Sequence, residues 1–483
     1  MVEEVELKLD LTTAAADALE DSDLLSGDPD VAKLRSIYFD TPTHTLRHAG
    51  LSLRIRTSGR KRVQTVKASG ASAAGLFVRS EWERPVSSDT PILDDTTPIR
   101  MLLGDAADAI GAVFEVRVER RSWIISDEGA IIELALDRGV TAVGERTSPI
   151  CEIEMELKEG KPAALFALAR HINAITSARL GVQSKADRGY RLVGPTATMV
   201  RAEPVTLGTD ITATEAFQQI VQTCIRQFRL NEALIMDGRN PEALHQARVA
   251  LRRLRSAFTI FKPVIGLRTH PMLREALRWV AAELGEARNL DVLLERMRPG
   301  ALQNRIAAAR EEAYNRIGEM LASARLRGLM LDLAEWTFIG DWLETPDANP
   351  GQPARDFAVT ALDRFRRKVK KGGLELVDTN DEESHEVRKD AKKLRYATEF
   401  FASLFGRKRE RRRHRKFGAA LEALQEHLGT LNDLSTARQV LEALGALNDP
   451  DARRLLAHDK RKRLLVLAAE AHEDLIDMKR FWR

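Results

Sequence analysis

The stretch EVELK, residues 4–8, alternates charged and apolar residues without a break. Because successive side chains of a β-strand point to opposite faces, we expect Glu4, Glu6 and Lys8 on one face of a strand and the apolar residues on the other. The apolar face is suited to a core. The charged face is either solvated or holds a ligand, and the alternation alone does not choose between these interpretations.

The first 195 residues repeat this period of two in several other segments. These segments are LSLRIRT (51–57), RVQTVK (62–67), LFVRSEWER (76–84), IIELALD (131–137) and ICEIEMELK (150–158). Repeated alternation favours a largely antiparallel sheet or barrel. Helical stretches are expected to interrupt it near residues 12–21, 98–111 and 162–178.

The chain after about residue 212 is rich in Ala, Leu, Arg and Glu at helical spacing. The preceding segment PTATMVRAEPVTLGTD (195–210) has two prolines and small polar residues, which suits a linker. We therefore expect an α+β protein with a β-rich domain at 1–197, a linker at 198–211 and an all-α domain at 212–483.

The helical half contains an internal duplication. HQARVALRRLR (245–255) aligns with HEVRKDAKKLR (385–395), and LGEARN (284–289) aligns with LGTLND (428–433). A Pro/Gly-rich break at 345–353 separates the two copies. We expect one helical unit at about 212–345 and its repeat at about 354–483.

The composition is that of a protein with more than one domain. A chain of 483 residues with 44% apolar residues is too long for a single core. Two cysteines cannot form a disulfide framework, which fits a reducing cytoplasm. No apolar run approaches the roughly 18 residues that a membrane-spanning helix needs, so no membrane partner is expected.

The two halves differ in charge. Residues 1–200 contain 25 basic and 30 acidic residues, a net charge of −5, and the remainder contains 50 basic and 41 acidic residues, a net charge of +9. The excess of basic residues favours an anionic partner for the second half.

The charged faces of the predicted strands carry both signs. CEIEMEL places Glu152, Glu154 and Glu156 on one face, and LSLRIR does the same with Arg54 and Arg56. If the sheet closes into a barrel, these faces can turn inward. Charges inside a barrel are unfavourable unless they are paired, so they either pair with each other or hold a polyanion with its metal ions.

A phosphate chain suits the second arrangement. Phosphoryl transfer depends on positioning and charge neutralisation, so it needs no Ser, Cys or His nucleophile. Arg side chains hold phosphate oxygens with two parallel hydrogen bonds. Mg²⁺ and Mn²⁺ prefer carboxylate oxygens and keep several waters, one of which can attack phosphorus.

The order of these motifs resembles the CYTH family, the triphosphate tunnel metalloenzymes. The resemblance covers about the first 195 residues and rests on EVELK, YFDTP (38–42), LSLRIR (51–56), QTVK (64–67), RSEWE (79–83), IELALD (132–137), CEIEMELKEG (151–160) and SKADRGY (184–190). It implies an eight-stranded antiparallel β tunnel that binds a triphosphate together with a divalent metal. The family includes thiamine-triphosphate hydrolases, adenylate cyclases and RNA-capping triphosphatases, so the tunnel alone does not fix the substrate.

The CYTH resemblance also implies roles for individual residues. The implied metal ligands are Glu4, Glu6, Asp137, Glu152, Glu154 and Glu156. The implied phosphate contacts are Lys8, Arg54, Arg56, Lys67, Arg79, Arg120, Lys185 and Arg188. The catalytic set is Glu4, Glu6, Lys8, Arg54, Arg56 and Lys67. Two other arginines on the same predicted strand, Arg117 and Arg121, are alternatives to Arg120 as the phosphate contact, and they lie on the opposite face.

Each copy of the helical unit carries a basic stripe. The spacing of 3, 4 and 3 residues aligns His245, Arg248, Arg252 and Arg255 in the first copy, and His385, Arg388, Lys392 and Arg395 in the second. Such a stripe is unfavourable by itself and becomes favourable opposite carboxylates or against a bound polyanion. A solvated or salt-bridged face is the alternative, with the histidines as caps or packing residues.

The densest basic run is RKRERRRHRK at 407–416. It could be a solvated segment, a nucleic-acid patch or the rim of a polyanion site. No aromatic residue interleaves it, whereas binders of single-stranded nucleic acid stack bases on aromatic side chains. We therefore expect a phosphate ligand and no nucleic-acid partner.

The duplicated pattern H-x2-R-x3-[RK]-[RK]-L-R, with the LG motifs downstream, resembles the CHAD family over about 212–483. The resemblance implies paired helical bundles with a basic pore that binds inorganic polyphosphate. The residues that carry this role are His245, Arg248, Arg252, Arg253, Arg255, His385, Arg388, Lys392, Lys393 and Arg395. Asn289, Asp291 and the LGTLND segment are expected to brace the bundle and pair with the basic helices. The domain order resembles bacterial CYTH–CHAD fusion proteins.

Three functional hypotheses follow. The first is a cytoplasmic inorganic triphosphatase that hydrolyses tripolyphosphate with Mg²⁺ or Mn²⁺ and carries a polyphosphate-binding domain. The second is a non-catalytic polyphosphate-binding scaffold. The third is a CYTH enzyme that acts on thiamine triphosphate or, as an adenylate cyclase, on ATP. The sequence leaves the substrate, the metal, the catalytic base and the oligomeric state open.

Overall fold

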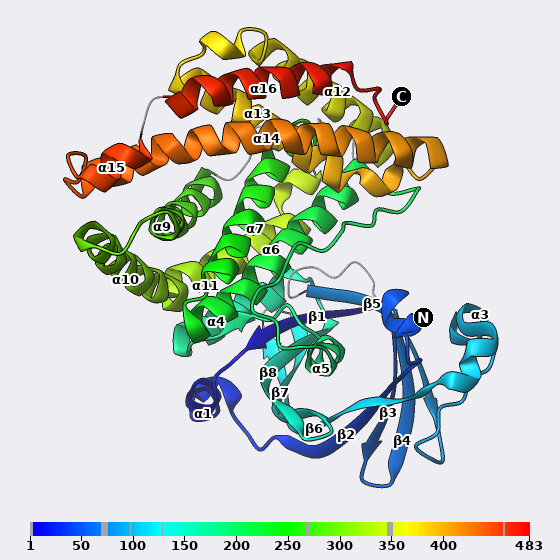
Figure 1. Ribbon diagram of the computed structural model, residues 1–483. Helices are drawn as coiled ribbons and strands as arrows, with labels where there is room; N and C mark the ends of the chain where they lie inside the picture. The colour runs from blue at the N-terminus through cyan, green and yellow to red at the C-terminus, as the bar shows by residue number, and fades with distance from the viewer. Residues whose placement is uncertain are drawn as a thin grey trace. The chain divides into compact units, whose positions relative to one another are not determined.

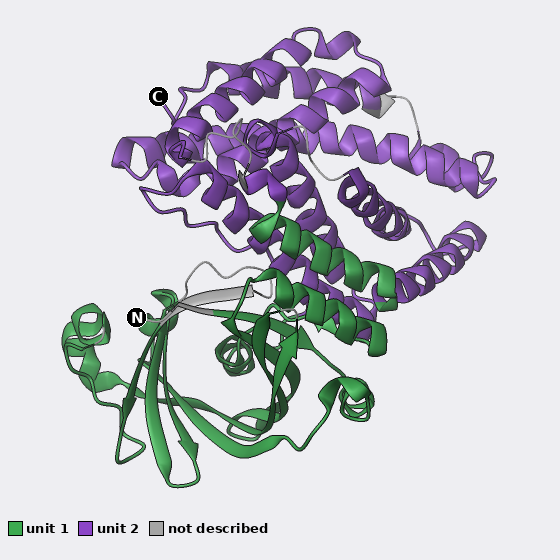
Figure 2. Ribbon diagram, turned by 180° about the vertical axis from the view of Figure 1, so that it is seen from behind, with its two compact units in different colours: residues 1–197, 322–340 green, residues 198–321, 341–483 purple. Residues whose placement is uncertain are grey.

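The chain forms two compact units (Figure 2). The computed structural model describes residues 3–68, 76–96, 98–127, 129–266, 271–344, 351–456 and 459–483, and the side chains of residues 3–4, 76–80, 344 and 459–460 lie outside this description. The first unit comprises residues 1–197 and 322–340, and the second comprises residues 198–321 and 341–483. This division differs from the predicted all-α domain at 212–483, because residues 322–340 belong to the first unit.

Within the described residues of the first unit, nine strands form one antiparallel sheet. They are β1 (Glu3–Asp10), β2 (Asp30–Asp40), β3 (Leu51–Ser58), β4 (Lys61–Ala68), β5 (Leu76–Pro85), β6 (Gly111–Asp127), β7 (Ala130–Val143), β8 (Arg146–Glu159) and β9 (Arg179–Leu180). Neighbouring strands pair in the order β5-β4-β3-β2-β6-β7-β8-β1-β9, and β5 also pairs with β1. The pairing therefore returns to its starting strand, and β1–β8 surround an interior (Figure 1).

The strand register brings the charged positions to one face. Lys8 of β1 lies opposite Glu154 of β8, and Asp137 of β7 lies opposite Glu152. Arg120 of β6 lies opposite Asp137. Directly paired residues share a face of the sheet, so these side chains all point to the interior. The predicted antiparallel β tunnel is confirmed.

The other face of β1 and β8 is apolar, as the alternation predicts. Leu7, Leu9, Ile153 and Met155 are fully buried, and α4 (Ala163–Ile175) packs against both strands. The other helices of this unit are α1 (Thr13–Glu20), α2 (Thr45–His48), α3 (Pro98–Leu103), α5 (Lys185–Val193) and α11 (Ala324–Ile339), with short 3₁₀ helices at 23–25 and 104–109.

Helix α11 comes from the far half of the sequence and packs against α4 and β9. Arg170 of α4 donates a hydrogen bond to Asp332 of α11 at 2.8 Å. Hydrophobic periodicity shows that a helix has a face to bury, and it does not show which unit covers that face. The sequence could therefore predict α11 as a helix without assigning it to the β-rich unit.

The second unit is helical among its described residues. Its helices are α6 (Ala213–Gly238), α7 (Pro241–Ile260), α8 (Lys262–Ile265), α9 (Pro271–Glu295), α10 (Ala301–Ala322), α12 (Ala354–Gly372), α13 (Asp381–Phe400), α14 (Lys408–Ala443), α15 (Pro450–Leu455) and α16 (Asp459–Asp477), with 3₁₀ helices at 341–344, 376–378 and 402–404. Part of the predicted break between the repeats, residues 345–350, lies outside the described residues.

The structure repeats where the sequence repeats. Phe261 of the first copy meets Phe357 and Phe401 of the second, which lie 140 positions after Phe217 and Phe261, respectively. Phe261 is 4.7 Å from Phe357 and 5.6 Å from Phe401 between ring centroids. Aromatic rings at these separations pack favourably. The two copies thus build a shared core from equivalent residues.

Backbone hydrogen bonds join the two copies in the same reciprocal way. The amide of Ala213 donates to the carbonyl of Gln352 at 2.8 Å, and the amide of Ala354 donates to the carbonyl of Ile211 at 2.9 Å. These bonds tie the starts of α6 and α12 together, as expected for equivalent helices of a duplicated unit.

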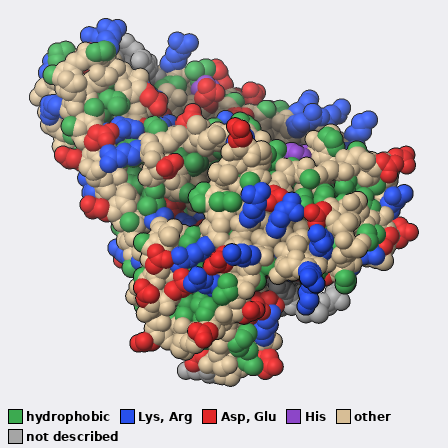
Figure 3. Space-filling model, turned by 90° about the horizontal axis from the view of Figure 1, so that it is seen from below, with side chains coloured by type: hydrophobic (Ala, Val, Ile, Leu, Met, Phe, Trp, Pro, Cys, Tyr) green, Lys and Arg blue, Asp and Glu red, His purple; other side chains and the backbone are tan. Residues whose placement is uncertain are grey.

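Exposed charge is mixed in sign on the face shown in Figure 3, where Lys and Arg side chains are interspersed with Asp and Glu. A chain with 30% charged residues is expected to expose such a surface, so exposed charge alone does not locate a site. No described helix combines the length and the apolar character that crossing a membrane requires.

Candidate functional site

A cavity of about 370 Å³ lies inside the ring of strands β1–β8. Its acidic lining residues are Glu6, Glu81, Glu83, Glu133, Glu154 and Glu156. Its basic lining residues are Lys8, Arg54, Arg56, Lys67, Arg120 and Lys185. A volume of this size is typical of small-molecule sites, and this lining suits a charged ligand.

Strands β3 and β4 supply one basic wall of the cavity. Arg54 and Arg56 share a face of β3. The Arg56 guanidinium is 3.6 Å from Glu83, and Lys67 Nζ is 2.9 Å from Glu81. The neighbouring charge of Arg54, followed by burial, lowers the pKa of Arg56. A bound anion would relieve this repulsion between like charges.

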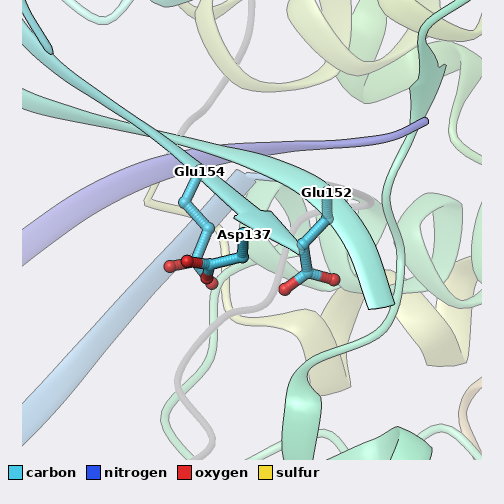
Figure 4. A group of neighbouring side chains, drawn as sticks. All are labelled: Asp137, Glu152 and Glu154. Atoms are coloured by element: carbon cyan, nitrogen blue, oxygen red, sulfur yellow. The ribbon is translucent and has the colours of Figure 1, made fainter. Parts of the chain in front are cut away.

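Three carboxylates gather on β7 and β8: Asp137, Glu152 and Glu154, the carboxylate trio. One oxygen from each lies within 4.8 Å of the other two, and the three side chains point to the same side of their strands (Figure 4). Asp137 and Glu152 are fully buried, and Glu154 is mostly buried. Such close carboxylates repel one another and need cations to remain ionised.

The ammonium group of Lys185 lies among the carboxylate trio. Its Nζ is 2.7 Å from Asp137 Oδ2, 2.6 Å from Glu152 Oε1 and 2.7 Å from Glu154 Oε1. No ligand is needed to explain how the trio stays charged, because the protein supplies a cation of its own.

Three further cations border the trio. The Arg120 guanidinium is 2.6 Å from Asp137 and also contacts Glu154. Lys8 contacts Glu154 and lies 2.9 Å from Glu6. Arg188 is 3.2 Å from Glu152 and 2.6 Å from Asp10. Charge-assisted hydrogen bonds of this kind fix the direction in which each cation points.

These contacts keep both signs charged. Burial alone would raise the pKa of Glu154, but Lys185, Lys8 and Arg120 hold it well below its ordinary value. Burial alone would lower the pKa of Lys185, but Asp137, Glu152 and Glu154 raise it well above its ordinary value. The carboxylate trio and Lys185 are therefore all ionised at neutral pH.

Helix α5 carries Lys185 into the site. The Tyr190 hydroxyl donates to Asp40 of β2 at 2.6 Å. Gly189 lies so close to Phe114 of β6 that an added Cβ would approach the ring to 2.1 Å. Glycine at this position lets α5 approach the inner face of the sheet closely enough for Lys185 to reach the trio.

A second charged site, in which basic side chains outnumber the nearby carboxylate of Asp433, lies in the helical unit. Basic side chains of α7, α9 and α13 face one another in a cationic cluster that comprises His245, Arg248, Arg252, Arg288, Arg388 and Lys392. Arg248 donates to the carbonyl of Gly285 at 3.1 Å, and Arg252 donates to the Tyr396 hydroxyl at 2.6 Å. Among the described residues, no carboxylate lies within ion-pair distance of Arg248, Arg252, Arg388 or Lys392.

The like charges of the cationic cluster perturb one another. Burial, followed by Arg252, Arg388 and Arg248, lowers the pKa of Lys392 to about 6. Burial, followed by Arg288 and other cationic neighbours, lowers the pKa of His245 to about 4. A bound polyanion would reverse both effects, because it would favour the protonated forms.

Two family models match the chain, one in each half. The model of the CYTH domain matches residues 3–190, and the model of the CHAD domain matches residues 219–442. The chain combines a CYTH domain with a CHAD domain. The first unit therefore contains the CYTH match, and the second contains the CHAD match apart from residues 322–340.

Similar proteins share one or both domains. The chain is 30% identical over 206 residues to an inorganic triphosphatase of Haemophilus influenzae. The matched residues are 40% of this chain and 55% of that protein. The chain thus spans about half the length of that relative. It is 26% identical over 406 residues to an uncharacterized protein of Mycobacterium tuberculosis, 75% of each chain. A solved CHAD domain of Ricinus communis is 29% identical, with a TM-score of 0.49, over 59% of this chain and 98% of that chain.

Most predicted residues of the CYTH domain come together. Those that line the cavity are Glu6, Lys8, Arg54, Arg56, Lys67, Arg120, Glu154, Glu156 and Lys185. Those that belong to the adjoining ion-pair network are Asp137, Glu152 and Arg188. The side chains of Glu4 and Arg79 lie outside the described residues, although their backbones pair across β1 and β5.

The geometry distinguishes Arg120 from its two rivals. Arg117 pairs with Glu115, and Arg121 pairs with Glu20 and Glu119, whereas Arg120 lines the cavity. The prediction missed Glu81, Glu83 and Glu133, which also line the cavity. Their parity on RSEWE and IIELALD was a usable signal, since they share a face with Arg79 and Asp137, respectively.

The carboxylates present fit a divalent metal ion. The candidate donors are carboxylate oxygens, which Mg²⁺ and Mn²⁺ prefer. The carboxylate trio brings three such oxygens within 4.8 Å of one another, and the Lys185 ammonium already stands among them as a cation. Glu6 adds a further carboxylate, whose Oε1 lies 2.9 Å from Lys8 Nζ.

The predicted residues of the CHAD domain separate into two groups. The cationic cluster contains His245, Arg248, Arg252, Arg388 and Lys392, together with Arg288, which the prediction missed. Arg253 and Arg395 instead pair with Glu399, and Lys393 pairs with Asp390, each at 2.8–2.9 Å. Arg255 faces Arg274 and Arg278. His385 contacts Asn432 at 2.9 Å.

Only part of the expected pairing between the LG motifs and the basic helices is found. Asn432 of the LGTLND segment also accepts a hydrogen bond from Arg388 at 2.9 Å, so it does pair with a basic helix. Asp291 does not, because it accepts hydrogen bonds from Arg310 and Tyr314 of α10 instead. The densest basic run begins α14, where Arg413 donates to the carbonyl of Arg483 at 2.7 Å.

Proposed function

We propose that the protein is a metal-dependent inorganic triphosphatase that hydrolyses tripolyphosphate in the CYTH tunnel and binds inorganic polyphosphate through its CHAD domain. The observation that carries the proposal is the cavity of about 370 Å³, lined by carboxylates and by Arg and Lys side chains of the same ring of strands. A linear phosphate chain with divalent cations is the ligand whose charges complement both linings. The inorganic triphosphatase of Haemophilus influenzae supports this choice.

In this proposal the basic side chains bind and orient the substrate. Arg54, Arg56 and Lys67 hold the oxygens of one part of the chain, and Arg79, Arg120, Lys185 and Arg188 hold or orient the remainder. Lys8 is directed at the same phosphate by Glu154 and Glu6. Fixed cations stabilise the charge that develops on the leaving phosphate, which is the main demand of phosphoryl transfer.

The metal ligands in this proposal are Glu4, Glu6, Asp137, Glu152, Glu154 and Glu156. A bound Mg²⁺ or Mn²⁺ supplies charge neutralisation on phosphate oxygens and activation of water. Helix α5 contributes Ser184, Lys185 and Ala186 to the cavity wall, so it limits the access of bulk water to the substrate. Exclusion of water strengthens every ionic contact inside the cavity.

The CHAD domain offers a different kind of phosphate site. In its cationic cluster, Arg248 and Arg252 of α7 and Arg388 and Lys392 of α13 have no ion-pair partner among the described residues. A polyanion longer than a triphosphate can bridge these two equivalent helices. In this proposal the polyphosphate role falls to His245, Arg248, Arg252, Arg288, Arg388 and Lys392. The ion-paired Arg253, Lys393 and Arg395 orient their carboxylate partners and contribute less to binding.

The test is a side-by-side assay of tripolyphosphate, thiamine triphosphate and ATP with Mg²⁺ and with Mn²⁺. We expect phosphate release from tripolyphosphate, with activity lost in the Glu4→Gln, Glu6→Gln double variant. Arg117→Ala, on an exposed side chain that does not line the cavity, is the control that should keep activity. No hydrolysis across neutral to alkaline pH, or full activity in the double variant, would contradict the proposal.

A polyphosphate-binding scaffold is the second candidate. It is favoured by one observation, namely that Lys185 already neutralises the carboxylates that would hold a metal. Retention of the chain on immobilised polyphosphate, with no hydrolysis of any of the three triphosphates, would select this function. Turnover of thiamine triphosphate, or cyclisation of ATP, in preference to tripolyphosphate would select another CYTH activity.

A further inference from the structure

The Lys185 ammonium and a divalent cation require the same oxygens. Lys185 Nζ lies 2.6–2.7 Å from one oxygen of each member of the carboxylate trio. Divalent cations bind carboxylate oxygens at about 2.0–2.6 Å. An ion that bridged these three oxygens would lie where the ammonium now lies, so the two cannot be held there together.

The neighbouring cations do not compete in this way. Arg120 contacts Asp137 and Glu154, Lys8 contacts Glu154, and Arg188 contacts Glu152. Each contacts one or two members of the trio. Among the described cations, Lys185 alone reaches all three.

Lys185 can leave the trio without the loss of its helix. Arg188, on the same helix, is 2.6 Å from Asp10, and the Tyr190 hydroxyl is 2.6 Å from Asp40. These contacts fix α5 independently of Lys185. Lys185 also lines the cavity, so a rotation of its side chain would move the ammonium from the trio towards a bound phosphate.

We propose that Lys185 is an internal competitor for the divalent metal ion, so that the metal binds the carboxylate trio only by displacing the Lys185 ammonium. This inference rests on the proposed metal-dependent function. It adds that the Lys185 ammonium partly neutralises the carboxylate trio until a metal ion binds. Its consequence is that Lys185 weakens metal binding in the free protein, in contrast to a residue that merely supports the fold.

The experiment is a Mn²⁺ titration of the full chain, followed by electron paramagnetic resonance of free Mn²⁺, with no phosphate present. Lys185→Met should bind Mn²⁺ about tenfold or more tightly than the wild type, a size typical of coupled sites. Arg188→Met removes the same charge from the same helix without emptying the trio, and its affinity should stay within about threefold of the wild type. Equal or weaker binding in Lys185→Met, or an equal gain in Arg188→Met, would overturn the proposal.

If Lys185→Met does not fold, a second pair of variants provides the same test. Lys185→Gln should show the same gain, because it also removes the charge. Lys185→Arg retains a cation and should show no gain. If Lys185→Gln and Lys185→Arg bind Mn²⁺ equally, the competitor role is excluded. Because Mn²⁺ binding is read without substrate, and hydrolysis is read on the wild type, the two proposals can fail separately. Tighter Mn²⁺ binding in Lys185→Met with no hydrolysis by the wild type would reject only the triphosphatase, whereas hydrolysis by the wild type with no gain in Mn²⁺ binding would reject only the competitor.

Discussion

The two phosphate sites proposed for this chain differ in how their buried charges are neutralised. In the CYTH tunnel, each of the four cations lies within 3.2 Å of a member of the carboxylate trio. In the CHAD domain, the cationic cluster gathers like charges, and Arg248, Arg252, Arg388 and Lys392 have no carboxylate partner among the described residues. The balanced site is neutralised without a ligand and must exchange partners to bind one. The cationic cluster keeps an excess of positive charge, which Asp433 offsets only in part and a polyanion would neutralise.

The pKa shifts follow the same division. The pKa of Glu154 lies well below its ordinary value and that of Lys185 well above, since each favours the charge of the other. In the cationic cluster, burial and like charges lower the pKa of Lys392 to about 6. The charged forms of Glu154 and Lys185 are therefore stabilised, and that of Lys392 is destabilised. Substitutions and changes of pH test this contrast, from the largest expected effect to the smallest.

Removal of one carboxylate should break the balance of the tunnel. Glu154 contacts Lys8, Arg120 and Lys185, so Glu154→Gln leaves buried cations without a partner. We expect the free energy of unfolding to fall by about 3–5 kcal/mol, and tripolyphosphate hydrolysis to fall by about 100-fold or more. Denaturant unfolding and a phosphate-release assay measure the two effects.

Glu119→Gln is the matched control for this prediction. Glu119 pairs with the partly exposed Arg121 and does not line the cavity. Its loss should change stability by less than about 1 kcal/mol. An equally small loss in Glu154→Gln would show that the tunnel does not depend on charge balance.

The balance of the tunnel should also depend on packing. In Gly189→Ala the new methyl group would lie 2.1 Å from the buried Phe114 ring, so either this ring or α5, which carries Lys185, must shift. We expect stability to fall by about 1–3 kcal/mol. Gly194→Ala, whose methyl group would come no closer than 3.8 Å to its neighbours, is the control for thermal unfolding. Equal melting temperatures for the two variants would contradict the prediction.

Loss of one cation from the CHAD domain should weaken ligand binding without lowering the stability of the protein. Lys392→Met should weaken polyphosphate binding by about fivefold to tenfold, since one charge-assisted contact is lost. It should leave the stability of the protein at pH 7 unchanged or slightly raised, because Lys392 repels its neighbours when protonated. Lys393→Met, which removes an adjacent charge already paired with Asp390, should bind polyphosphate nearly as well as the wild type. Fluorescence anisotropy with labelled polyphosphate compares the variants.

The smallest expected effect is a pH dependence of polyphosphate binding. The pKa of Lys392 is lowered to about 6 in the free protein, and a polyanion raises it again, so binding takes up a proton between about pH 6 and the bound pKa. Affinity should therefore rise severalfold as the pH falls from about 8 to 6, and less in Lys392→Met. Anisotropy titrations at pH 6, 7 and 8 provide the test, and parallel pH profiles for both proteins would exclude Lys392 as the group.

The same shift gives a signed prediction for stability. Between about pH 6 and the unfolded pKa near 10.5, the unfolded chain binds more protons at Lys392 than the folded chain does. Its contribution to stability therefore rises with pH across this window. The carboxylates of the tunnel behave differently, because the lowered pKa of Glu154 stabilises the fold above the unfolded pKa and loses that contribution as the medium becomes acidic.

Much of the tunnel could be predicted from single strands. The parity of EVELK and CEIEMEL assigned Glu6, Lys8 and Glu154 to one face, and the register confirms that assignment. The family resemblance singled out Arg120 against Arg117 and Arg121. Parity also contained a signal for Glu133 that the prediction did not use. Strand periodicity is reliable here because one face is apolar and packs against helices.

The sequence by itself determined the two domains, the alternation that lines the tunnel and the duplication that repeats Phe261 at Phe401. These features depend on local periodicity, which the chain carries in any conformation. Only the tertiary structure decided that α11 packs with the CYTH domain, that Arg253 pairs with Glu399 while Arg252 joins the cationic cluster, and that Lys185 enters the carboxylate trio. These contacts depend on distances between segments that lie far apart in the chain. A shift of about 3 Å is enough to turn an ion pair into two charges that interact only weakly.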